Sequence, residues 1–175
     1  WIAERCIALL DQYKKGDKPF MLWASFFDPH NPYLIPEPWA SMYKPEDMDI
    51  PETVNDDISD MPLHYRVTRE ENQDKSIWEE GNPSYPVHGI AQHRWTKEKL
   101  QQNKAIYYGM VSMMDHYIGK ILDHLEENGQ IDNTLIIFTT DHGAFIGHHG
   151  LVGKGVFDYE DAVKIPFIAS YKGKM

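Results

Sequence analysis

The sequence has little cysteine: Cys6 is the single one among 175 residues, so no disulfide can form within it. The residues around it, WIAERCIALL, follow the pattern of an amphipathic helix, which favours a buried structural thiol over a reactive one. Long apolar runs are also lacking, because none approaches the ~20 residues needed to span a bilayer. These absences exclude an internal disulfide framework and a transmembrane helix.

Basic residues are scarce as well, with 17 Lys and Arg against 27 Asp and Glu and a net charge of −10. This balance argues against a nucleic-acid partner, since phosphate binding needs clustered cations. An anionic substrate would have to be held by a few local cations. The chain starts at Trp1 and ends just after an apolar run, so we expect a segment of a longer protein. A signal peptide therefore cannot be judged from it.

What the sequence does contain is an alternation of helical and strand-like segments. Helices are predicted over residues 2–14 and 96–128, and buried strands over 19–27, 134–140 and 164–170. This order predicts an α/β fold with a mostly parallel sheet sandwiched between helices, present here in incomplete form. The longer predicted helix carries one apolar stripe, formed by Ile106, Met110, Met113, Tyr117, Ile121 and Leu125.

We interpret residues 1–175 as part of one domain that is interrupted by an insertion at about residues 44–95. The insertion is rich in Pro, Asp, Glu and Asn and shows little periodicity apart from a short helix predicted near residues 68–80. It is either an ordered wall beside a cleft or a surface excursion.

Polar clusters follow two of the predicted strands. The first cluster contains Asp28, His30 and Asn31, and the second contains Asp141 and His142, followed by His148, His149 and Lys154. Ligands of open α/β sheets bind beyond the carboxyl ends of the strands, so both clusters are expected to face one site.

Asp141 and His142 offer one oxygen and one nitrogen ligand to a divalent cation, provided that the backbone turns, which Gly143 permits. The alternative is an aspartate that caps the next helix beside a solvated histidine. Lys154 lies among several glycines and could hold an oxyanion, or it could be an ordinary solvated lysine.

Taken together, these motifs resemble a known family. Four segments resemble those of formylglycine-dependent sulfatases of the alkaline phosphatase superfamily and follow one another in the same order. From the amino-terminal side they are KPFMLWASFFDPHNPYLIPEPW, YYGMVSMMDHYIGKILDHLEENG, NTLIIFTTDHGAFIGHHGLVGKG and YEDAVKIPFIAS. The resemblance covers nearly the whole chain outside the insertion.

The resemblance implies that Asp141 and His142 bind the divalent metal and that Lys154 contacts the sulfate. It implies that His30 contacts the sulfate and assists the departing alcohol, and that His149 supports substrate binding; His148 receives no role. Calcium is the family's usual metal and our first expectation. Because an imidazole ligand suits manganese better than calcium, manganese is the second.

The family's nucleophile, a Cys or Ser oxidised to formylglycine, has no counterpart here: Cys6 lacks the following Pro and Arg. The nucleophile is expected upstream, and this segment alone is expected to be inactive. The implied partner is a sulfated small molecule or glycan, selected by the insertion, and the implied location is periplasmic, extracellular or lysosomal. Two alternatives stay open: phosphodiester or phosphonate monoester hydrolysis, and a non-catalytic binding module. Substrate identity and oligomeric state are not indicated.

Overall fold

The chain forms two compact units in a computed structural model that describes residues 1–16, 18–71 and 95–174. Unit 1 comprises Trp1–Tyr43, Ile106–Thr139 and Phe167–Met175, and unit 2 comprises Lys44–Ala105 and Thr140–Pro166. Unit 2 thus begins at the residue where the insertion is expected to start. Among the described residues, no helix is long and apolar enough to cross a membrane.

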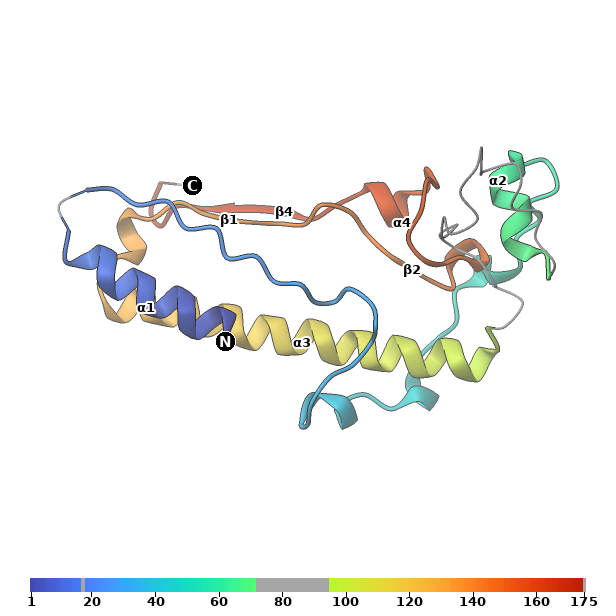
Figure 1. The fold of residues 1–175 in the computed structure, drawn as a ribbon, viewed down its shortest axis with the longest axis horizontal. Helices are drawn as coiled ribbons and strands as arrows, with labels where there is room; N and C mark the ends of the chain where they lie inside the picture. Colours follow the sequence, from blue (N-terminus) through green and yellow to red (C-terminus); the bar gives the residue numbers. More distant parts are fainter. Residues whose placement is uncertain (17, 72–94, 175) are drawn as a thin grey trace, which may run out of the picture. The chain divides into compact units, whose positions relative to one another are not determined.

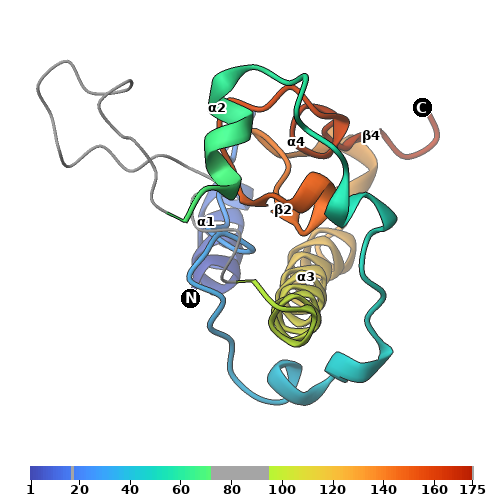
Figure 2. The same cartoon turned by 90° about the vertical axis from the view of Figure 1, so that its right-hand side faces the viewer.

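Two helices form the core of unit 1. Helix α1 (Ile2–Lys14) lies alongside the part of α3 (Lys97–Glu127) that belongs to this unit (Figures 1 and 2). Tyr117, Ile121 and Leu125 of the predicted stripe pack with α1 in one apolar cluster, and burial raises the pKa of the Cys6 thiol. Both predicted helices and the buried thiol are therefore confirmed. The buried members of the cluster are Ala3, Cys6, Leu10, Ile121 and Leu125.

The only strand pair that the structure describes in unit 1 joins β1 (Ile136–Thr139) to β4 (Phe167–Ser170), and it is antiparallel. The two strands run side by side in Figure 1. Both were predicted as strands, but this pair is not one of the parallel crossovers expected from the sequence. The connection, which includes helix α4 (Glu160–Val163), folds within unit 2 and returns the chain to the end of β1 at which it left, so that Phe167 pairs with Thr139.

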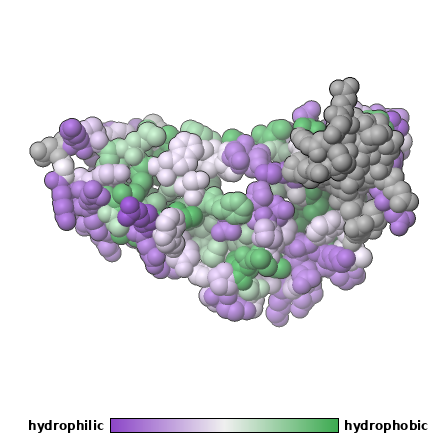
Figure 3. All heavy atoms as spheres, in the orientation of Figure 1, coloured by the Kyte–Doolittle hydropathy of each residue, from purple (hydrophilic) through white to green (hydrophobic). Residues whose placement is uncertain are grey.

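The apolar segment over residues 19–27 is extended but joins no strand ladder among the described residues. Phe20, Leu22 and Phe26 pack against the α1–α3 cluster, whereas Met21 and Trp23 are 83% and 79% exposed. Apolar side chains of β1 and β4 are also exposed, and apolar surface is visible in Figure 3. Exposed apolar surface of this kind is typical of faces that pack against other protein.

Unit 2 is built around a short hairpin of β2 (Phe145–Ile146) and β3 (Val152–Gly153), which are paired antiparallel. The described part of the predicted insertion supplies helix α2 (Leu63–Arg66) and several single-turn 3-10 helices, so residues 44–71 are ordered in short elements. Most of the helix predicted near residues 68–80 lies outside the described residues, so it stays a prediction. The unit's core consists of Tyr65, Phe145, Leu151, Phe157 and Ala162.

The remaining elements are single 3-10 turns that connect the longer ones. In unit 1 these are η1 (Trp39–Ser41) and η7 (Ile131–Asn133), and in unit 2 they are η2 (Pro45–Asp47), η3 (Glu52–Asn55), η4 (Val67–Arg69) and η8 (His148–Gly150).

An ion pair ties the described insertion to α3 within unit 2. The buried ammonium of Lys104 donates to the carboxylate of Asp49 at 2.9 Å and to its backbone carbonyl at 3.0 Å. The hydrogen bond from Lys104 is the main cause that holds the pKa of Asp49 below its ordinary value, and the charges of Lys104 and His148 add to it against partial desolvation.

This pair predicts a pH-dependent contribution to stability. A carboxylate whose pKa is lower in the folded state stabilises the fold above its unfolded pKa and loses this effect as the pH falls through the folded pKa. We expect Asp49→Asn to lower the melting temperature at pH 7 and to have no effect at acid pH, where Asp49 is itself protonated. Thermal unfolding followed by circular dichroism at a series of pH values checks this, with the exposed Asp60→Asn as control; a deficit that persists in acid would contradict it.

Candidate metal- and anion-binding site

Asp141 lies two residues after the end of β1 and has an exposed carboxylate. Its side chain is 82% exposed, and its Oδ1 accepts hydrogen bonds from the backbone N–H of His142 at 2.9 Å and the hydroxyl of Thr140 at 3.3 Å. Partial desolvation raises the pKa of Asp141, but the lowering causes outweigh it, foremost the hydrogen bond from the backbone N–H of His142, so that the pKa lies below its ordinary value. The carboxylate is therefore available as a charged oxygen ligand.

The imidazole of His142 presents its second nitrogen to the same space. Its Nδ1 lies 2.7 Å from the carbonyl oxygen of Gly143, a contact that requires the proton on Nδ1 and leaves the lone pair on Nε2. This Nε2 lies 3.5 Å from Oδ2 of Asp141. Two ligands at right angles on one ion, with bonds of about 2.1–2.4 Å, are ~3.0–3.4 Å apart. The pair therefore fits a shared divalent cation.

Lys154 completes this group from the far side of the hairpin. Its Nζ lies 3.2 Å from Nε2 of His142, just after the end of β3. The structure thus brings together three of the residues predicted from the sequence. Within the described ranges, no cluster of three or more His, Cys, Asp or Glu side chains is arranged to hold a metal. Asp141 and His142 accordingly supply part of a coordination shell, with a cation beside it that could attract an oxyanion.

Gly143 is needed here for a different reason from the one its sequence context suggests. Its φ is not among the positive ones, so the turn does not require glycine. Instead its N–H donates to the carbonyl of Ala162 at 2.8 Å, and a Cβ at this position would lie 1.9 Å from the carbonyl oxygen of Asp161. Close approach of the α4 backbone therefore leaves no room for a side chain.

His149 lies between two carboxylates. Its Nδ1 is 2.8 Å from Oδ2 of Asp56 and its Nε2 is 3.4 Å from Oδ2 of Asp161. Its ring stacks on Tyr159 with centroids 3.7 Å apart, and burial raises the pKa of that phenol. Sequence reasoning missed Asp56 and Asp161; the acidic stretch YEDAV was the available signal for the second, and Asp56 had none. The predicted role of His149 in substrate binding stays a prediction.

The predicted site residue His30 belongs to unit 1. Its backbone N–H donates to the carbonyl of Phe27 at 3.2 Å, the two rings lie 4.8 Å apart, and its Nδ1 contacts the carbonyl of Asn31. Because the other predicted site residues belong to unit 2, the expected convergence of His30 with Lys154 stays a prediction.

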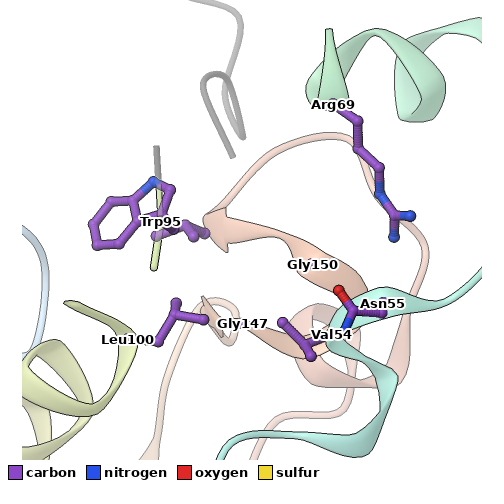
Figure 4. Close-up of a pocket in the computed structure, with 8 residues that line it drawn as sticks. Val54, Asn55, Arg69, Trp95, Leu100, Gly147 and Gly150 are labelled. Atoms are coloured by element: carbon purple, nitrogen blue, oxygen red, sulfur yellow. The ribbon is translucent and has the colours of Figure 1, made fainter. Parts of the chain in front are cut away.

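A cavity of about 270 Å³ lies beside the hairpin in unit 2 (Figure 4). The guanidinium of Arg69 points toward it and also donates to the backbone carbonyls of Asp56 and His149. Trp95, at the end of the predicted insertion, stands at its edge. The lining residues are Val54, Asn55, Arg69, Trp95, Leu100, Gly147, Gly150 and Val152.

Comparison with known proteins gives one consistent result. The family model described as Sulfatase matches residues 2–175. The chain is 34% identical to an arylsulfatase of Clostridium perfringens over all 175 of its residues, which is 32% of that protein. It is 41% identical to an N-acetylglucosamine-6-O-sulfatase of Bacteroides thetaiotaomicron over 73 residues, 42% of this chain and 13% of that protein.

A solved structure shows the same similarity in three dimensions. The phosphonate monoester hydrolase of Silicibacter pomeroyi superimposes with a TM-score of 0.74 at 25% identity, over 98% of this chain and 32% of that one. The α/β fold is confirmed by these matches. The chain spans about a third of the length of the arylsulfatase and of the phosphonate hydrolase.

Proposed function

The chain belongs to the sulfatase family, and from this premise we propose that the protein that carries it hydrolyses sulfate monoesters. The observation that supports the proposal most directly is the group formed by Asp141, His142 and Lys154, in which two ligand atoms lie 3.5 Å apart and an ammonium lies 3.2 Å from one of them. The exposed carboxylate of Asp141 can bind a metal, and the ammonium of Lys154 can pair with the negative charge of a sulfate ester.

In this proposal each side chain has one task. Asp141 and Nε2 of His142 would hold a divalent metal, which supplies Lewis-acid polarisation of the ester oxygens when bound. Lys154 pairs with a sulfate oxygen as a point charge. His30 gives a proton to the departing alcohol. The nucleophile, a formylglycine, is expected outside this chain.

The finer assignments follow the family resemblance. We propose calcium as the metal, with manganese as the alternative because of the imidazole ligand. The substrate is proposed to be a sulfated carbohydrate or an aryl sulfate, in line with the relatives named for aryl and N-acetylglucosamine sulfates. Export to a periplasm, a lysosome or the extracellular space is part of the same proposal.

A second candidate function is hydrolysis of phosphonate monoesters or phosphodiesters. The high structural similarity to the phosphonate monoester hydrolase favours it. The same metal and lysine can neutralise a phosphoryl oxygen as well as a sulfuryl oxygen.

The two functions predict different substrate preferences for the full-length protein. We expect kcat/KM for 4-nitrophenyl sulfate to exceed that for 4-nitrophenyl phenylphosphonate, measured by release of nitrophenolate with Ca²⁺ or Mn²⁺ supplied after chelation. The reverse order would assign the protein to the phosphonate branch. Absence of both activities, together with metal binding, would instead favour a non-catalytic binding module.

A further inference from the structure

The metal-binding segment rests on the backbone of α4. The N–H of Gly143 donates to the carbonyl of Ala162 at 2.8 Å, and the carbonyl oxygen of Asp161 is so close that a Cβ on Gly143 would lie 1.9 Å from it. Gly143 directly follows Asp141 and His142. The position of both proposed ligands therefore depends on where α4 lies.

The position of α4 depends in turn on His149. The imidazole has one nitrogen 3.4 Å from the carboxylate of Asp161, on α4, and the other 2.8 Å from that of Asp56, next to η3. It stacks on Tyr159, which stands at the start of α4, at an interplanar angle of 6°. One side chain thereby joins α4 to the segment of residues 52–56.

The backbone of His149 is equally constrained. Its N–H donates to the hydroxyl of Thr53 at 3.1 Å, and its carbonyl accepts from Arg69 at 3.2 Å. Its φ of 52° is in the left-handed region, where a side chain is sterically costly and glycine is the usual residue. The hydrogen bonds to Thr53 and Arg69 hold the backbone in this conformation.

We propose that His149 and Asp161 form a positioning pair that holds the Asp141-His142 segment in its metal-binding orientation. This inference rests on the proposed function because it concerns the metal of the same site. A direct substrate role fits His149 less well: its side chain is only 19% exposed, and the carboxylates at both nitrogens would repel a sulfate.

The test uses the full-length protein with His149→Gln, Asp161→Asn and the double variant. Residues that orient metal ligands typically contribute about ten- to hundredfold to affinity, so we expect each single variant to raise the Kd for Ca²⁺ or Mn²⁺ by that factor in calorimetry. The contact between His149 and Asp161 is lost in either single variant, so the Kd of the double variant should rise by less than the product of the two single effects. Asp161→Glu keeps the charge and should retain most of the affinity.

Two further readouts separate positioning from general damage. Hydrogen–deuterium exchange of residues 141–146 should rise in His149→Gln, and at subsaturating metal kcat should fall while KM for the ester stays within about threefold. The control is His124→Gln in unit 1. It breaks the contact between Nε2 of His124 and Oδ1 of Asp11 at 2.9 Å, and the side chain of His124 is also 19% exposed. An unchanged Kd in folded His149→Gln, or an equal loss in His124→Gln, would overturn the proposal.

Failure of the proposed function gives a different result. If the unaltered protein binds metal but hydrolyses no sulfate or phosphonate ester, the proposed function fails while the Kd comparison still decides the positioning role. If the unaltered protein binds neither Ca²⁺ nor Mn²⁺, the positioning proposal fails with its metal site. If His149→Gln does not fold, Asp161→Asn and Asp161→Glu provide the same comparison through the other member of the pair.

Discussion

Replacing Asp141 by alanine in the full-length protein is expected to weaken divalent-metal binding by at least about a hundredfold, because residues that only orient a ligand already contribute ten- to hundredfold. Asp141 supplies the only carboxylate oxygen of the proposed pair, 3.5 Å from Nε2 of His142. Ester hydrolysis should fall at least in parallel, since Lewis-acid assistance is lost with the metal. Calorimetry with Ca²⁺ and Mn²⁺ and a 4-nitrophenyl sulfate assay measure the two effects.

The exposed carboxylate of Asp132 provides a matched control. It is 72% exposed and pairs with Lys172 in unit 1 at 3.3 Å. Asp132→Ala removes the same charge from the chain, so it should leave metal affinity and hydrolysis unchanged. Full metal affinity in Asp141→Ala would remove Asp141 from the metal site, and the sulfate ester proposal would lose its main support.

The second large effect is expected at Gly143. An added methyl group would lie 1.9 Å from the carbonyl oxygen of Asp161, and this neighbour is backbone that cannot rotate away. We expect Gly143→Ala to lower the free energy of unfolding by about 3 kcal/mol, at the upper end for overpacking in a tight site. Urea denaturation followed by tryptophan fluorescence measures the change.

Substitutions at two other glycines distinguish the steric effect at Gly143 from the general effect of replacing glycine by alanine. Gly119 on α3 has open space where its Cβ would be, so Gly119→Ala should stabilise by about 0.5–1 kcal/mol through helix propensity. At Gly109 a Cβ would lie 2.4 Å from the carbonyl of Trp39, within unit 1. Gly109→Ala should therefore destabilise without weakening metal binding, whereas Gly143→Ala should do both. Wild-type stability in Gly143→Ala would show that α4 can move aside.

Much of the local structure could be predicted because it depends on neighbours along the chain. Helices α1 and α3 agree with prediction to within a residue at each end, since hydrogen bonds between residues four apart and a continuous apolar stripe specify them locally. The same periodicity identified the buried face that contains Cys6. The ligand pair also came from adjacent residues, Asp141 and His142, at the end of a recognisable strand.

The direction of the strands in unit 1, and which strand pairs with which, came only from the tertiary structure. An apolar run shows that a segment can be a strand, but not which neighbour it joins. In the structure, residues 19–27 join no strand ladder among the described residues, and β1 pairs antiparallel with β4. Strand direction is decided by the path of the connection, which in this chain runs through unit 2 and returns by the four-residue α4.

The sequence by itself determined the two long helices, the segments that form β1 and β4, the buried thiol and the dipeptide that offers an oxygen and a nitrogen ligand. Only the tertiary structure decided that Gly143 must lack a side chain and that His149 lies between Asp56 and Asp161. These residues are 93 and 12 positions from His149. Contacts over such separations depend on how the whole chain closes its loops, and no local pattern of residues encodes that path.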